Sequence, residues 1–143
     1  MSTEMAKDII EKEMLEQDGL DREFELFGGE PFLEFEMVKE LYDFLNNRTW
    51  DKRWIVQFTT NGVLVHGEIQ KWLKERSDKI RLGLSADGTR EMHNANRSNS
   101  YDSIDFVFFA EAGTDIKMTV STKTLPHLSE GIIHIHNLGF TSI

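Results

Sequence analysis

No cysteine occurs among the 143 residues of the chain. The protein therefore cannot form a disulfide, use a thiolate nucleophile, or hold zinc or an iron–sulfur cluster through cysteine. Basic residues are also in the minority, with 16 Lys and Arg against 25 Asp and Glu and a formal net charge of −9. This balance argues against a nucleic-acid partner, because binding to a phosphate backbone relies on Lys and Arg.

Long hydrophobic runs are missing as well. No segment approaches the roughly 20 apolar residues that span a bilayer, and residues 1–4 lack the basic-then-apolar pattern of a signal peptide. We therefore expect a cytoplasmic protein with no membrane partner. The hydrophobic content of 39% and charged content of 29% are those of a globular protein, and the length predicts one domain over residues 1–143.

Helical and strand patterns alternate along the chain. Apolar residues at helical spacing predict helices, and runs rich in β-branched and aromatic residues predict strands. The expected helices are 3–17 (with Met5, Ile9 and Ile10 inward), 35–45 (with Phe35, Val38, Leu41, Tyr42 and Leu45 at helical spacing), 66–76, 101–112 and 125–138 (with Leu125, Leu128, Ile132 and Ile135 inward). The expected strands are 23–27, 53–60, 80–85 and 116–121, with a long polar loop at 86–99 and a strand starting at 140–143. The segment 101–112 can also be read as a strand. This order predicts parallel strands joined by right-handed helical crossovers.

The strands are apolar on one side and largely polar on the other. Trp54, Val56 and Phe58 alternate with Gln57 and Thr59, and side chains alternate between the two faces of a sheet. Such strands suit a barrel that encloses a wet cavity under a layer of helices. An antiparallel sheet with one face in solvent is the alternative.

Gly28-Gly29-Glu30-Pro31 follows the first expected strand and precedes a helix. Ligands of parallel α/β folds bind at this end of the strands. Two glycines allow a ligand to approach the backbone closely, and Glu30 places an anion where a ligand ammonium could lie. The alternative is an ordinary tight turn between a strand and a helix.

Further strings follow in order near the ends of later strands: FTTNG at 58–62, LSADG at 84–88 and HNANR at 93–97. With the Gly-Gly-Glu-Pro turn, they resemble the core of radical S-adenosylmethionine enzymes. The resemblance is greatest to the peptide- and protein-modifying branch that often carries a C-terminal SPASM domain. Residues 118–121 also resemble the next strand of that core.

The resemblance implies a partial (βα) barrel, S-adenosyl-L-methionine as cofactor, and a peptide or protein substrate in the parent enzyme. It assigns the methionine amino group to the backbone of Gly28 and Gly29 with Glu30. It assigns the ribose hydroxyls to Ser85 and the methionine carboxylate to Arg97. Gln57 and Asn61 are expected to line the cavity.

The chain departs from the family in two respects. Asn94 stands where an Asp is usual, and the Cys-x-x-x-Cys-x-x-Cys loop that ligates the 4Fe-4S cluster is missing. We therefore expect a barrel that is incomplete at both ends: a gene fragment, a trimmed piece or one part of a split assembly, without reductive cleavage activity alone.

Two other interpretations stay open from the sequence. One is a cluster-free module that binds S-adenosylmethionine, a nucleoside or a peptide. The other is a non-functional remnant that folds by pairing with a second copy or a complementing chain across its open sheet edges. No metal site is expected, because His134 and His136 lie at a spacing that separates them on a helix. His93 has either a positioning role or a place on a loop surface.

Overall fold

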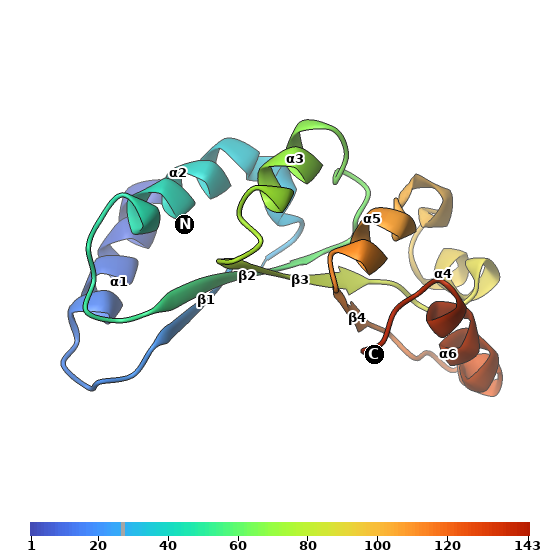
Figure 1. Ribbon diagram of the computed structural model, residues 1–143. Helices are drawn as coiled ribbons and strands as arrows, with labels where there is room; N and C mark the ends of the chain where they lie inside the picture. The colour runs from blue at the N-terminus through green and yellow to red at the C-terminus, as the bar shows by residue number, and fades with distance from the viewer. Residues whose placement is uncertain (27) are drawn as a thin grey trace.

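A computed structural model describes residues 1–26 and 28–143. The chain forms a four-stranded sheet, and Figure 1 shows helices between the strands. All neighbouring strands run parallel, in the order β1-β2-β3-β4. Their bounds are β1 (Arg22–Leu26), β2 (Trp54–Thr60), β3 (Ile80–Ser85) and β4 (Asp115–Lys117). The predicted parallel α/β fold is confirmed, and the antiparallel alternative is wrong. Phe27, with which the first strand was expected to end, lies outside the described residues.

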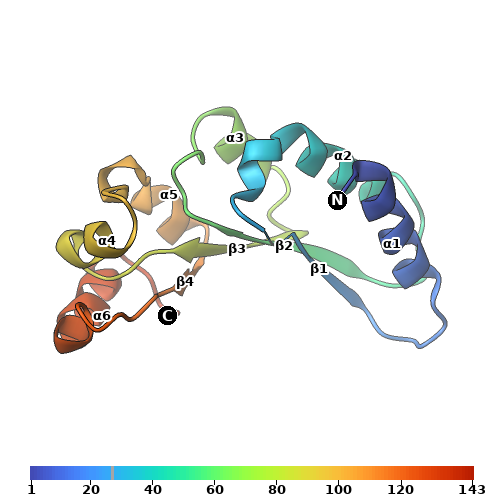
Figure 2. The same cartoon turned by 180° about the vertical axis from the view of Figure 1, so that it is seen from behind.

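Six α-helices connect and cover the strands in the described part of the chain. They are α1 (Thr3–Leu15), α2 (Phe35–Asn46), α3 (Glu68–Lys74), α4 (Arg90–Asn96), α5 (Phe106–Glu111) and α6 (Leu128–Asn137). Short 3-10 helices occur at η1 (Pro31–Glu34), η2 (Tyr101–Ser103) and η3 (Leu125–His127). Figures 1 and 2 show α1, α2, α3 and α5 on one side of the sheet, while α4 and α6 lie together near the end of β3. The other face of the sheet, here called the inner wall, has no covering helix in these views.

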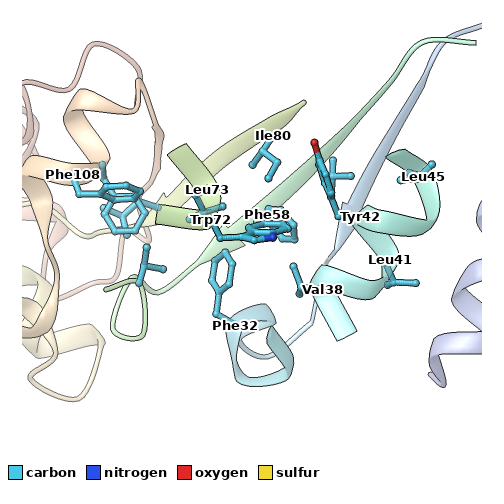
Figure 3. Close-up of a cluster of buried hydrophobic side chains, with 14 of the residues drawn as sticks. Phe32, Val38, Leu41, Tyr42, Leu45, Phe58, Trp72, Leu73, Ile80 and Phe108 are labelled. Carbon is cyan, nitrogen blue, oxygen red and sulfur yellow. The ribbon is translucent and has the colours of Figure 1, made fainter. Parts of the chain in front are cut away.

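The helix-covered face of the sheet forms the core. Along β2 the burial alternates residue by residue, with Trp54, Val56 and Phe58 buried. Aromatic rings from the covering elements pack on this row, and Figure 3 shows Phe32 and Trp72 beside Phe58. The ring centroids of Phe32 and Phe58 lie 5.4 Å apart, a favourable distance for aromatic pairs. The predicted one-sided apolar pattern of the strands is thus confirmed.

Each of the two N-terminal helices buries a row of side chains that are three or four residues apart. In α2 the buried side chains are Val38, Leu41, Tyr42 and Leu45, as predicted. In α1 the Oγ of Ser2 accepts a hydrogen bond from the backbone N–H of Met5 and caps the helix, but the buried stripe is Ala6, Ile10 and Met14. The expectation that Met5 and Ile9 face inward is wrong, since they are 56% and 48% exposed. Lys7 bonds Glu40 of α2 at 2.5 Å, so α2 lies against the flank of α1 away from those two residues.

The predicted loop at 86–99 is wrong, because it contains helix α4. Thr89 starts this helix by accepting a hydrogen bond from the N–H of Met92 at its Oγ1, and Met92 is buried. The expected helix at 101–112 is divided into η2 and α5. Asp105 caps α5 by accepting from the N–H of Phe108 at 3.1 Å, and this cap sets a new helix start.

The C-terminal third also differs from the expectation. β4 ends at Lys117 rather than at residue 121. The helix expected at 125–138 is divided into η3 and α6, and Leu125 is exposed rather than inward, because Pro126 places it in the 3-10 turn. Residues 140–143 are not a strand, although the N–H of Ile116 donates to the carbonyl of Ser142 at 3.0 Å.

Among the helices of residues 1–26 and 28–143, none is long and apolar enough to cross a membrane.

Candidate functional site

The carboxyl ends of β1, β2 and β3 meet at one edge of the sheet, here called the rim. Parallel pairing places Leu26 beside Phe58 and Thr60 beside Leu84. The Gly-Gly-Glu-Pro turn, the Thr-Asn-Gly turn and the Ser-Ala-Asp-Gly turn therefore leave the sheet at the same edge. Ligands of open parallel sheets bind at this edge, so the rim is the candidate site.

The carboxylate of Glu30 ties the first turn of the rim to the second. Its Oε1 accepts a hydrogen bond from the hydroxyl of Thr60 at 2.7 Å, and its Oε2 accepts from the N–H of Asn61 at 2.8 Å. The N–H of Phe32 donates to the same carboxylate at 3.3 Å. Glu30 thus braces the rim from within the chain, and a ligand ammonium would be an additional donor to it.

The two glycines before Glu30 present an open backbone. Both are exposed, and no atom lies within 4 Å of the position that a Cβ would take on either residue. Behind them, Pro31 begins η1 and Phe32 is buried against Phe58, which anchors the turn to the core. The backbone groups of Gly28 and Gly29 are therefore accessible to a small molecule on the rim.

Gly62 closes the second turn of the rim. Its φ is +79°, and a Cβ built there would lie 2.8 Å from Cδ1 of Leu84. Its N–H donates to the hydroxyl of Thr60 at 3.0 Å. A side chain at this position would push the turn away from β3, so only glycine lets the chain leave β2 this close to its neighbour.

The third turn of the rim is held by a buried ion pair. Asp87 is fully buried, and its carboxylate accepts from Nε of Arg97 at 2.7 Å and from Nη2 of Arg97 at 3.0 Å. It also accepts from the N–H of Thr119 at 2.7 Å and from Nδ2 of Asn96 at 3.2 Å. Asp87 therefore joins the end of β3 to α4 and to the segment after β4. One edge of the Arg97 guanidinium, the group expected to bind the methionine carboxylate, is engaged in this pair.

His93 lies directly behind Asp87. Its side chain is fully buried in α4, so a place on a loop surface is wrong. The N–H of Asp87 donates to Nδ1 of His93 at 3.4 Å. The hydroxyl of Ser100 donates its proton to the carbonyl of Arg97 at 2.8 Å, so it accepts from Nε2 of His93 at 2.9 Å. Burial lowers the pKa of His93, and these bonds suit the neutral ring with its proton on Nε2.

The remaining predicted residues line the inner wall and its upper end. Gln57 lies in β2 with Glu25 of β1 and Arg81 of β3 as its neighbours in register. Ser85 ends β3, half-buried, beside Lys117 of β4. Among the predicted site residues, a direct hydrogen bond joins Glu30 and Asn61, while Gln57, Ser85 and Arg97 stand on separate elements.

The sequence interpretation did not assign a role to Asp87, Ser100 or Thr60. Asp87 and Arg97 are ten residues apart, which is no helical or strand spacing, so periodicity gave no signal for the pair. The string Asp87-Gly88 before a Thr cap was the one local indication that this acid starts a structured turn.

The described residues hold no group of three or more His, Cys, Asp or Glu side chains placed to bind a metal ion.

Comparisons with known proteins place the chain among larger relatives, although no family model matches it. It is 32% identical over 106 residues to a cysteine-type anaerobic sulfatase-maturating enzyme of Clostridium perfringens, covering 69% of this chain and 26% of that enzyme. It is 24% identical over 124 residues to an uncharacterized protein of Methanocaldococcus jannaschii, covering 81% of this chain and 43% of that protein. The chain thus spans less than half the length of either relative.

Solved structures give the same result for the fold. The structure of native anSMEcpe with bound AdoMet and a peptide superimposes with a TM-score of 0.86 at 23% identity, covering 99% of this chain and 41% of that one. The structure of the same enzyme with bound AdoMet alone gives a TM-score of 0.82. The resemblance drawn from the sequence motifs is therefore confirmed: the chain has part of the fold of the SPASM-type radical S-adenosylmethionine enzymes.

Proposed function

We propose that this chain is the S-adenosylmethionine-binding part of a radical S-adenosylmethionine fold of the peptide- or protein-modifying type. The observation that carries the proposal is the rim, where Glu30 bonds Thr60 and Asn61 and fixes the first two turns against each other. A pre-formed rim with an open diglycine backbone suits a small polar ligand. The similarity to structures that contain AdoMet supports the same ligand.

Each residue of the rim would bind a different part of S-adenosylmethionine. The accessible backbone of Gly28 and Gly29 would accept the ammonium group of the methionine part, with Glu30 supplying negative charge nearby. Ser85, half-buried at the end of β3, would bond the ribose hydroxyls. Arg97 would meet the methionine carboxylate with the part of its guanidinium that Asp87 leaves available. Gln57 and Asn61 would line the cavity.

The chain does not fit a 4Fe-4S cluster. Such clusters are held by cysteine thiolates, and the sequence has no cysteine. A cluster beside this rim would need ligands from outside these 143 residues. We infer that the chain alone does not cleave S-adenosylmethionine reductively. Incubation with iron, sulfide, dithionite and S-adenosylmethionine, followed by chromatography, should give no 5′-deoxyadenosine above the protein-free control; a catalytic amount from this chain would contradict the inference.

Calorimetric titration tests the binding proposal directly. We expect saturable binding of S-adenosylmethionine to the wild-type chain and none to Gly29→Val. Since no atom lies within 4 Å of the Cβ position of Gly29, the variant should fold while its side chain blocks the backbone. Ala112→Val places the same valine side chain at an exposed residue that follows the last residue of α5 and should bind like the wild type. Equal binding by all three proteins would place the ligand elsewhere.

A cluster-free binding module is the second candidate function, favoured by the complete absence of cysteine. Competition by adenosine, S-adenosylhomocysteine and methionine separates a general nucleoside site from one that needs the whole cofactor. β1 has one edge without a partner strand in the described sheet, and such edges pair with other chains. Light scattering will show whether a second copy covers this edge when no complementing chain is present.

A further inference from the structure

Two cations on the inner wall have no carboxylate partner among the described residues. Arg81 lies in β3 and Lys117 in β4, and neither is in an ion pair, whereas most other Lys and Arg side chains of the described chain are. The chain as a whole has 25 acidic and 16 basic residues. Two unpaired cations on one bare face of such an acidic protein are therefore available to an external anion.

Lys117 lies along the wall rather than away from it. Its Cε and Cγ are 3.5 and 3.7 Å from the position that a Cβ on Gly83 would take, and the hydroxyl of Thr59 is 3.2 Å from the same point. The aliphatic stem of Lys117 thus crosses β3 where Gly83 has no side chain, and it covers this otherwise bare stretch of strand. The stem therefore carries the ammonium group on the inner-wall side of β3.

Carboxylates share the inner wall but lie elsewhere on it. Glu23 and Glu25 are on β1, two strands away from β3, and the hydroxyl of Thr59 donates to Oε1 of Glu25 at 3.4 Å. Asp115 is at the start of β4, in register with Gly83. None of the three lies within 4.0 Å of the nitrogens of Arg81 or Lys117. The wall is therefore negative along β1, mixed at the start of β4 and positive around Lys117 and Arg81.

We propose that Lys117 and Arg81 form an anion-binding wall that selects a peptide with a carboxylate side chain. The proposal rests on the peptide-modifying function proposed above and specifies the peptide. A carboxylate side chain is opposite in charge to Lys117 and Arg81, whereas the net charge of −9 and the neighbouring Glu and Asp side chains repel a polyanion. Gln57 and Thr59, half-buried on the same wall, supply hydrogen-bonding groups for the peptide beside its acidic residue.

The test uses two blocked peptides, acetyl-Gly-Ser-Ala-Asp-Ala-Ser-Gly-amide and its Asn counterpart, titrated into the labelled chain and followed by NMR. We expect the Asp peptide to bind about two- to fivefold more tightly, the range for an exposed charge pair. Its shifts should centre on the amides of Gly83 and Lys117. Lys117→Gln and Arg81→Gln should each weaken the Asp peptide toward the Asn peptide, while Lys123→Gln, an exposed lysine outside the wall, should not.

Equal affinity for the two peptides, or an equal effect of Lys123→Gln, would overturn the proposal. Displacement of the Asp peptide by inorganic phosphate at the same concentration would also overturn it, because the wall would then be a general anion site. The titrations are repeated with S-adenosylmethionine. If S-adenosylmethionine binds but the Asp and Asn peptides bind equally well, only this inference is wrong. If the Asp peptide binds more tightly in a way that depends on Lys117 but S-adenosylmethionine does not bind, only the proposed function is wrong. If neither ligand binds, both are wrong.

Discussion

The hydroxyl of Thr60 donates a 2.7 Å hydrogen bond to the carboxylate of Glu30, a residue 30 positions earlier in the chain. The bond crosses from the turn after β1 to the end of β2, so it fixes two parts of the rim that no helix or strand joins directly. The N–H of Asn61 donates to the other oxygen of the same carboxylate. Glu30 is therefore a structural brace of the rim before it is a contact for any ligand.

Glu30→Gln should destabilise the protein by about 1–2 kcal/mol, because a hydrogen bond to a charged acceptor contributes roughly 1.5–3 kcal/mol and the amide keeps part of it. Thr60→Val, which keeps the shape of the side chain, should lower the free energy of unfolding by about 1 kcal/mol. Urea unfolding followed by circular dichroism measures both. Glu34→Gln, on an exposed carboxylate of η1, is the control and should change little. If Glu30→Gln is as stable as the wild type, the bracing role does not explain the glutamate of this motif.

Asp87→Asn should be far more damaging, since it leaves the guanidinium of Arg97 beside a neutral partner. Removing one member of a buried ion pair costs roughly 3–5 kcal/mol, and we expect about 3 kcal/mol because the Arg97 side chain is 24% exposed while Asp87 is 0% exposed. Asp102→Asn breaks an exposed Asp–Arg pair, in which the side chains of Asp102 and Arg90 are 62% and 57% exposed. That control should lose at most about 1 kcal/mol. Thermal unfolding measures both variants. If Asp87→Asn and Asp102→Asn lose similar amounts of stability, the burial of Asp87 does not determine the cost of losing an ion pair.

Strand bounds and buried helix faces could be predicted from the sequence where they depend on local periodicity. The bounds of β3 and the buried stripe of α2 follow from alternation and from the 3.6-residue repeat. Helix α4 could not be found in this way, because its place depends on Arg97 reaching Asp87 and on the close approach of Gly88 and Gly131. The rim motifs were found as strings, but the partners of Glu30 and Arg97 come from distant positions that no spacing rule connects.

His93 should make the protein less stable as the pH falls below neutral. Burial holds its pKa below the ordinary value of 6.5, so near pH 6 the unfolded chain binds a proton there and the folded chain does not. Stability then rises with pH in this range, and it is lost as the pH falls from about 6.5 toward the pKa of the folded state. Urea titrations at pH 5.5, 6.5 and 7.5 measure the effect. His93→Gln should flatten the dependence, and exposed His127→Gln should not.

Gly62→Ala on the rim and Gly113→Ala, in the turn before β4, separate the cost of packing from the cost of backbone strain. Both glycines have positive φ, +79° and +66°, but a Cβ on Gly62 would lie 2.8 Å from Leu84, whereas none would be within 4 Å on Gly113. Alanine at Gly113 should therefore cost only the left-handed backbone, about 1–2 kcal/mol. Alanine at Gly62 should add an overpacking cost of about 1–3 kcal/mol and shift the NMR signals of Leu84 and Asn61. If the two variants unfold at the same urea concentration, the close approach of the second turn to β3 does not control the rim.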